Sequence, residues 1–278
     1  LKEQLLHCAV VHADETPVAM LAPGNGKTHR AYLWAYAAGA FENLRAVVYD
    51  FTASRSGEHA RRFLGTGTER AWRGSLVCDD FSGYKALFAQ GVTEAGCMAH
   101  ARRKFVELHI ANKSDIAASA IEFIGQLYGI EREVKELLPE QRGHERRTRA
   151  APIATALHDW LIAQRTRVTN AGATAKAIDY SLNRWAALVR YLDDPALPID
   201  NNHDEQQIRP WATGRKNWLF AGTLLAGQRA AAIMSLIQSA KLNGHDPYAY
   251  LKDVLTRLPT HKARDIDELL PHRWTALT

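Results

Sequence analysis

Short apolar runs separated by turn residues fill the first hundred residues of the chain. Such runs are typical of buried strands. They predict five strands, at residues 18–21, 30–36, 46–51, 75–79 and 93–97, after a short buried-strand pattern at 10–14. Pro23-Gly24-Asn25-Gly26 is strong turn chemistry, so we expect a hairpin around it. Helices are expected at residues 2–9, 57–64 and 84–88.

After His100 the pattern becomes helical. Apolar residues recur at the three- and four-residue spacing of an amphipathic helix at positions 116, 120, 123, 124, 127 and 130. The charged segment 141–150 is expected to be an exposed connection, with further helices at 153–164 and 175–192. Asn243-Gly244 then closes a later helix, and Asp246-Pro247 opens the last one.

These elements predict an α/β fold with a mixed five-stranded sheet, in which a meander is followed by helix, strand, helix and strand, and an all-helical insertion interrupts this core. We place four regions along the chain. They are a strand-containing core at 1–105, the helical insertion at 106–197, core helices at 198–243 and a short helical C-terminal region at 244–278.

Composition narrows the class of protein. Hydrophobic residues make up 46% and charged residues 23%, which excludes a mainly disordered chain. No apolar stretch is long enough to span a membrane, and the first residues do not resemble a signal peptide. Three cysteines cannot all pair, which favours a reducing compartment. We therefore expect a soluble intracellular protein, and the first residue, which is not Met, hints that the chain begins within a longer one.

The net charge of +5 is mild, but basic residues are clustered. The clusters are Arg102-Arg103-Lys104, the arginines of 142–149, and Arg209 with Arg215 and Lys216. Basic patches suit a polyanion such as nucleic acid. Solvated helix faces would explain each cluster equally well.

Three acidic residues stand out. Asp14 and Asp79 are each expected where an apolar strand ends, and Glu205 on the first turns of a helix. A carboxylate at the end of a buried strand must be capped, paired or bound to metal, because burial of a bare charge is costly. Together, three such acids would form an oxygen cage for Mg²⁺. Taken singly, each acid is explained better as an N-cap or a turn residue than as a metal ligand.

Several motifs, spread in order along the chain, resemble those of transposases of the insertion-sequence-66 family. The matching segments are Ala13 to Pro17, Asp79 ahead of Gly83-Tyr84, Cys97 to Phe105, Pro198 to Asn202 with Glu205, Ile208-Arg209-Pro210, Gly214 to Gly222, Asn243 to Leu251, and Leu269 to Trp274. These matches run from residue 13 to residue 274.

The resemblance implies an RNase H-like core with a DDE triad that cuts and joins DNA using divalent metal. By motif position the triad is Asp14, Asp79 and Glu205, holding two Mg²⁺ or Mn²⁺ ions. Asp80 stands where the family usually has Gly, so it competes with Asp79. Only one of the two can face the site, because side chains alternate along a strand, and we choose Asp79 from its distance to the Gly-Tyr pair.

The resemblance also implies DNA contacts. Candidates for phosphate binding are Arg102, Arg103, Lys104, Arg209, Arg215 and Lys216. His100, Asn201 and Asn202 are auxiliary candidates, although His100 is equally explained as an ordinary packed side chain. Trp211, Trp218 and Tyr84 offer rings on which bases could stack, and for Trp218 we prefer core packing because Leu219 and Phe220 flank it.

The expected partners are therefore DNA, both element ends and target, and further copies of this chain in a homodimer or larger assembly on DNA, with accessory proteins of the element. The expected location is the bacterial cytoplasm, on the nucleoid when DNA is bound. The alternative is a truncated, catalytically silent transposase fragment that acts only in DNA binding or assembly.

Overall fold

The computed structural model describes residues 1–65 and 71–276 and belongs to the α/β class. Contacts divide the chain into two compact units. The core unit comprises Leu1–Leu76, Phe81–Thr93 and His203–Thr278, and the helical unit comprises Val77–Asp80 and Glu94–Asn202. Among the described residues, no helix combines the length and the apolar character that crossing a membrane requires.

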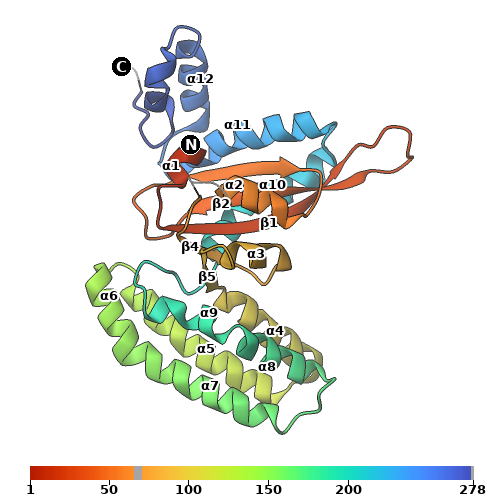
Figure 1. Ribbon diagram of the computed structural model, residues 1–278, viewed down its shortest axis with the longest axis vertical. Helices are drawn as coiled ribbons and strands as arrows, with labels where there is room; N and C mark the ends of the chain where they lie inside the picture. The colour runs from red at the N-terminus through yellow and green to blue at the C-terminus, as the bar shows by residue number, and fades with distance from the viewer. Residues whose placement is uncertain (66–70, 277–278) are drawn as a thin grey trace. The chain divides into compact units, whose positions relative to one another are not determined.

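One five-stranded sheet orders the strands β3-β2-β1-β4-β5 (Figure 1). The strands are β1 (Val10–Met20), β2 (His29–Ala38), β3 (Val47–Thr52), β4 (Ser75–Cys78) and β5 (Thr93–Gly96). The first three form the expected antiparallel meander, with β1 paired to β2 and β2 paired to β3. The division between the two units falls within β4 and β5.

Strand β1 is longer than its sequence predicts. Asp14, Glu15 and Thr16 interrupt the apolar run, and Pro17 lacks the N–H that a central strand normally donates. The pairing nevertheless continues through all four residues, from Val11 opposite Ala38 to Met20 opposite His29. By contrast, the first helix is shorter than expected, because α1 covers only Lys2–Leu5.

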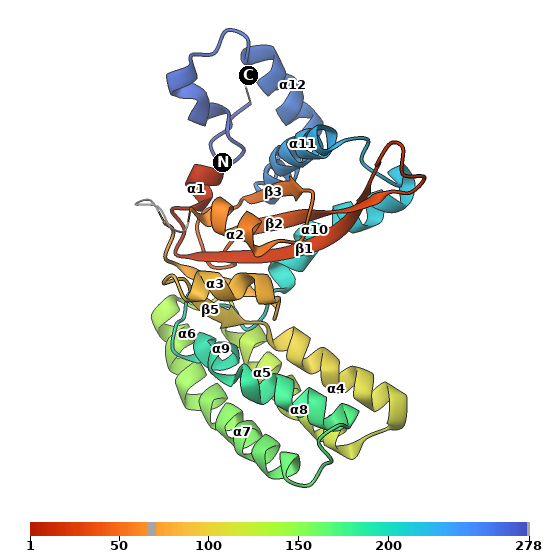
Figure 2. The same ribbon diagram turned by 45° about the vertical axis from the view of Figure 1, so that its right-hand side comes forward.

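Helix α11 (Leu224–Leu242) covers the edge strand β3 (Figure 2). Ser239 Oγ accepts a hydrogen bond from Val47 N (3.0 Å), and Ser235 Oγ accepts one from Tyr49 N (2.8 Å). These hydroxyls accept hydrogen bonds from N–H groups that an edge strand would otherwise leave unpaired. Gly227 lets the helix lie close, since a Cβ there would come within 2.4 Å of the Phe51 ring.

The remaining elements of the core unit are short apart from α10. They are α2 (Gly57–Leu64), a 3₁₀ turn (Ser82–Tyr84), α3 (Lys85–Phe88), α10 (Asn202–Trp218, whose first residue belongs to the helical unit), α12 (Pro247–Arg257) and a 3₁₀ segment (Ala263–Leu269). Ser56 caps α2. Asp246 caps α12 by accepting from Ala249 N (2.7 Å), at the helix start that the sequence predicts. The side of the sheet that faces α10 and α11 forms an apolar core around Leu33, Phe51 and Trp211.

The helical unit consists of helices packed side by side (Figure 2). They are α4 (Met98–Asn112), α5 (Asp115–Val134), α6 (Pro139–Glu145), a π-helical segment (Arg146–Ala150), α7 (Ala151–Arg165), α8 (Ala173–Asn183), α9 (Trp185–Val189) and a 3₁₀ turn (Arg190–Leu192). Helix α5 carries the predicted apolar face. The predicted start of the insertion, residue 106, falls within α4.

The expectation that 141–150 is an exposed connection is wrong. This segment is helical throughout, and it continues from α6 into α7. Arg142 and Arg146 are buried, at 4% and 0% exposure. The Arg146 guanidinium pairs with Glu131 (2.6 Å) and donates to the carbonyls of Tyr191 and Leu197. Two of the four arginines in this basic cluster therefore hold the helical unit together instead of facing solvent.

Candidate active site

Asp14 lies in the middle of β1, opposite Ala35 of β2, and not at the end of a strand as predicted. Its Oδ1 atom accepts a hydrogen bond from the backbone N–H of Glu15 (2.8 Å), and the side chain is half-buried. The pairing of β1 with β2 holds the backbone of Asp14 in place within the sheet.

Glu205 lies in the first turn of α10, as predicted, next to Asp204. Asp204 is fully buried, and neither of its carboxyl oxygens has a hydrogen-bond partner among residues 1–65 and 71–276. Burial raises the pKa of the Asp204 carboxyl well above its ordinary value, and the charges of Asp14, Glu205 and Glu15 raise it further. Asp14 and Glu205 are far apart in sequence, yet the charges of both influence the pKa of the buried Asp204 carboxyl.

Sequence reasoning missed Asp204. The signal was present, because Asp204, Ile208 and Trp211 recur at the i, i+4, i+7 spacing of one helix face, and Ile208 and Trp211 are core residues. An acid on that stripe is directed at the sheet. Its neighbour His203 packs its ring against that of His12 on β1, with the centroids 5.3 Å apart.

The charge of Glu15, the next residue along β1, is balanced by two neighbouring side chains. Its side chain is 1% exposed and forms an ion pair with Arg55, whose Nε donates to Oε1 (2.7 Å). The Tyr84 hydroxyl donates to Oε2 (2.9 Å). Tyr84 itself is fully buried, so its ring is a core side chain and not a surface for stacking.

Asp79 and Asp80 belong to the helical unit, where Asp79 directly follows the last residue of β4. Asp79 is half-buried, whereas Asp80 is exposed. Asp80 forms an ion pair with Arg184 (2.5 Å), and the same guanidinium pairs with Glu94 (2.8 Å). Asp80 is therefore part of an ion-pair network within the helical unit, together with Arg184 and Glu94.

The auxiliary candidates lie in the helical unit near the start of α4. Met98 N donates to the carbonyl of Ile199 (3.1 Å), and the buried Asn201 donates its backbone N–H to Cys97 Sγ (3.2 Å). Asn202 donates its side-chain amide to Asp200 (2.7 Å), while His100 is half-buried in the first turn of α4. These contacts fix the segment that leads into α10.

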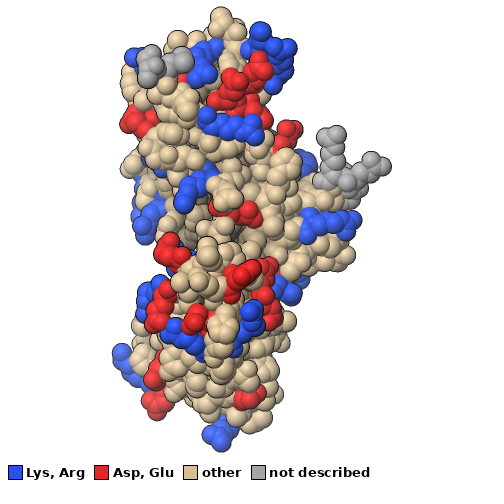
Figure 3. Space-filling model, turned by 90° about the vertical axis from the view of Figure 1, so that its left-hand side faces the viewer, with Lys and Arg blue, Asp and Glu red and all other residues tan. Residues whose placement is uncertain are grey.

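The residues predicted to contact DNA differ in their exposure and in their hydrogen bonds. Arg102, Arg103 and Lys104 are exposed on α4, and Arg209 and Lys216 are exposed on α10. Arg215 instead donates to Thr16 Oγ1 (3.0 Å) and to the carbonyl of Pro17, which ties α10 to β1. On the face drawn in Figure 3, acidic and basic side chains are intermixed.

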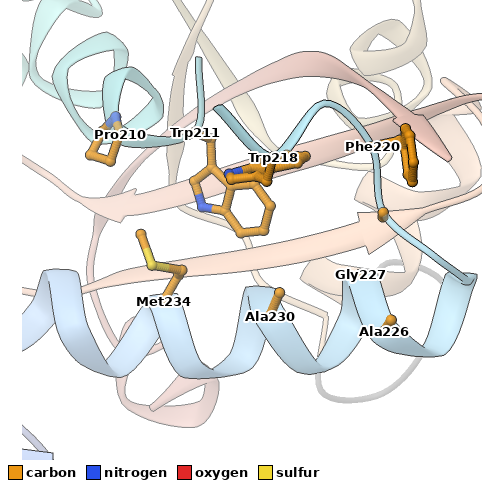
Figure 4. Close-up of a pocket in the computed structure, with 9 residues that line it drawn as sticks. Pro210, Trp211, Trp218, Phe220, Ala226, Gly227, Ala230 and Met234 are labelled. Atoms are coloured by element: carbon orange, nitrogen blue, oxygen red, sulfur yellow. The ribbon is translucent and has the colours of Figure 1, made fainter. Parts of the chain in front are cut away.

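An apolar pocket of about 330 Å³ lies between α10 and α11 (Figure 4). Trp211 and Trp218 meet edge to face in its wall, with ring centroids 5.9 Å apart. Trp211 is buried at 5% exposure, but Trp218 is 40% exposed. Core packing of Trp218 was therefore the wrong expectation. Helix α10 ends at Trp218, and the next residue, Leu219, adopts a positive φ.

Comparison with known proteins gives two family matches that follow one another along the chain. A model described as "Transposase IS66 family" matches residues 1–229. A model described as "IS66 C-terminal element" matches residues 235–272. No solved structure is significantly similar to the chain.

Among curated proteins, the chain is similar to uncharacterized proteins of Sinorhizobium fredii (strain NBRC 101917 / NGR234). It is 35% identical to y4jD over 279 residues, covering 96% of this chain and 54% of that protein. It is 36% identical to y4qI over 274 residues, covering 94% of this chain and 50% of the relative. The chain thus spans about half the length of these relatives.

Proposed function

Because the chain belongs to the IS66 transposase family, we propose that it is the catalytic part of a DDE transposase, which cleaves DNA and transfers the freed strand to a target. Asp14, Asp79 and Glu205 are the proposed triad. The observation that carries this proposal is that β1 lies against the start of α10, where the ring of His12 packs on that of His203 and the charge of Asp14 reaches the buried Asp204. Strand transfer joins element ends to a target, so we propose DNA as partner and a dimer or larger assembly on it, with accessory proteins of the element.

The fold supports the proposal. The sheet follows the expected order of meander, helix, strand, helix and strand, which we interpret as an RNase H-like core. On this interpretation, the helices of the helical unit are an insertion between β5 and α10. The pairing of Asp80 with Arg184 supports Asp79 as the second acid of the triad.

The residues around Asp204 suit a hard divalent cation. Asp14, Asp204 and Glu205 offer only carboxylate oxygens, which Mg²⁺ and Mn²⁺ prefer as ligands. The charges of Asp14 and Glu205 act on the buried Asp204 carboxyl, and repulsion among neighbouring acids favours a cation or a proton among them. We propose that Asp14 and Glu205, with Asp79, hold two such ions.

When bound, the ions would supply Lewis-acid stabilisation of the phosphate and activation of water or a 3′-hydroxyl. The chain's own residues prepare the site for this. The N–H of Glu15 orients the Asp14 carboxylate, and Arg55 and Tyr84 balance the charge of Glu15. The raised pKa of Asp204 means that its carboxyl holds a proton more readily than an ordinary aspartate, which limits repulsion of Asp14.

Nicking of a supercoiled plasmid that carries the genomic DNA flanking this gene tests the proposal. With Mn²⁺, the chain should nick the plasmid, whereas Asp14→Asn and Glu205→Gln should each lower the rate by about a hundredfold or more, since each removes a ligand charge. Glu122→Gln, exposed on α5, is the matched control. DNA binding should survive in all three variants.

The alternative, a silent fragment that only binds DNA or assists assembly, makes a different prediction. In that case the chain binds the plasmid but nicks it no faster than Glu205→Gln does. Nicking at equal rates by all four proteins would overturn the catalytic proposal, because the triad would then be irrelevant to the activity.

A further inference from the structure

A hollow of about 470 Å³ lies within the helical unit, between α4, α5 and Asn202. Its lining residues are Ala99, Arg102, Arg103 and Val106 of α4, Gly125, Tyr128 and Arg132 of α5, and Asn202. On both helices these residues recur at the spacing of one face. The hollow is therefore formed by two facing helix stripes and not by a frayed end or a loop.

Gly125 keeps the floor of the hollow open. A Cβ added at Gly125 would lie in open space, with nothing within 4 Å of it outside its own helix. Any larger residue at this position of α5 would project a side chain into that space. Glycine in the middle of a helix costs about 1 kcal/mol relative to alanine, so the local stability of α5 does not explain it.

Two guanidinium groups of the hollow have no partner in the described part of the chain. Arg102 and Arg132 form neither a hydrogen bond nor an ion pair there. Nearby acids are already engaged. Asp200 accepts hydrogen bonds from Tyr128 Oη (2.6 Å) and from Asn202, and Glu131 is paired with Arg146.

The open space at Gly125 and the guanidinium groups of Arg102 and Arg132 together favour binding of a phosphate group. Guanidinium groups bind phosphate with two parallel N–H donors, so an open space edged by three arginines fits a phosphodiester better than a carboxylate or an apolar group. Asn202 adds a polar amide at the rim, and the bond from Tyr128 to Asp200 fixes that wall. The arrangement is a built pocket, because both walls and the floor come from ordered helices.

We propose that this hollow binds a backbone phosphate of DNA, with Arg102 and Arg132 as its principal ligands. The inference rests on the proposed function in that the polyanion is DNA. It goes beyond that function by adding Arg132 and Gly125 to the interface, and by making the helical unit a direct DNA-binding part of the protein.

The test measures the affinity of the full chain for a fluorescein-labelled duplex of mixed sequence as a function of NaCl concentration. Each phosphate contact contributes about 0.9 to the slope of log affinity against log salt for duplex DNA. Because both arginines hold one phosphate, the double variant Arg102→Ala/Arg132→Ala should lower that slope by about 0.9 and weaken binding about tenfold at ~0.1 M salt.

Two controls distinguish DNA binding in the hollow from a general effect of removing positive charge. Arg147→Ala/Arg167→Ala removes the same charge from exposed positions of the same unit and should leave the slope almost unchanged. Gly125→Leu fills the floor without changing charge and should weaken binding by itself. Gly125→Ala adds only a methyl group, so its effect should be much smaller, although both substitutions favour the helix.

Equal losses in the two double variants would overturn the proposal, as would wild-type affinity in Gly125→Leu. Calorimetry with inorganic phosphate distinguishes a second source of the same chemistry. Arginine-dependent binding of free phosphate with unchanged DNA affinity would make this a small-anion site and contradict the DNA assignment. If the wild-type chain does not bind DNA at all, the proposed function fails, and that result is distinct from a failure of the hollow.

Discussion

Asp204 on α10 is buried beside Asp14 of β1, and the charge of Asp14 contributes to raising the pKa of the Asp204 carboxyl. The relationship joins two segments about 190 residues apart and brings Glu205, the neighbour of Asp204, to the same part of the core unit. It is an unfavourable contact for the protein alone, since it crowds acids that burial already penalises. Such contacts are typical of functional sites.

Asp204→Asn should make the protein more stable at neutral pH. A carboxyl whose folded pKa is raised stabilises the fold while it is protonated in both states, and this stability is lost as the pH rises through the folded pKa. Wild-type stability should therefore fall relative to the variant from about pH 4 upward, by at most about 1.4 kcal/mol per pH unit. Urea unfolding in EDTA at several pH values measures this, and parallel pH profiles of the two proteins would refute it.

Arg215→Ala should lower stability, whereas Lys216→Ala should not. Arg215 donates to Thr16 and to Pro17, and hydrogen bonds from a charged donor are worth about 1.5–3 kcal/mol. Lys216 is exposed on the same helix and is the better candidate for a phosphate contact. Chemical unfolding of both variants tests the first statement, and the salt slope of DNA affinity tests the second, with a loss of about 0.9 expected for Lys216→Ala alone.

Arg146→Ala should destabilise the helical unit by about 3–5 kcal/mol, because it leaves Glu131 without its buried partner. Arg147→Ala, one residue further along and exposed, should change stability by less than about 0.5 kcal/mol. Circular dichroism during thermal unfolding compares them. Similar melting temperatures would mean that Arg146 is a surface residue, as its place in a basic cluster first suggested.

Gly227→Ala should be destabilising by about 1–3 kcal/mol even though alanine favours a helix. The added methyl group would meet the Phe51 ring, so α11 would have to shift away from β3. Gly222→Ala is the control, because a Cβ at Gly222 meets nothing within 4 Å. Denaturant unfolding should show a lower midpoint for Gly227→Ala only.

The sequence predicted those elements whose signals are local. The hairpin around Gly24 and Gly26 follows from turn residues, and the start of α12 follows from its cap residue. Both are confirmed, as is the helix expected at 57–64. Strand β1 was underestimated, because its polar residues break the apolar pattern while the pairing with β2 carries the strand through them. Pairing of this kind depends on the partner strand, which no single segment reveals.

In the candidate site, too, features with local signals could be predicted, whereas features that depend on contacts between segments could not. The local sequence predicted that Glu205 lies on the first turns of a helix, and the structure confirms that position. The burial of Asp204, the bonds of Arg215 to β1 and the exposure of Trp218 depend on contacts between distant segments. For Arg142 and Arg146, composition suggested a solvated or nucleic-acid-binding surface, and only the packing of α5 against the π-helical segment shows their structural role.

A crystal structure of the protein soaked in Mn²⁺, with anomalous scattering recorded near the manganese edge, tests the central proposal most directly. We expect manganese bound by carboxylate oxygens of Asp14 and Glu205, with Asp79 and not Asp80 as the third acidic ligand. Ligand distances should be near 2.2 Å, as expected for a hard divalent cation bound by oxygen. Manganese bound elsewhere, or none at these acids at millimolar concentration, would contradict the proposed DDE site.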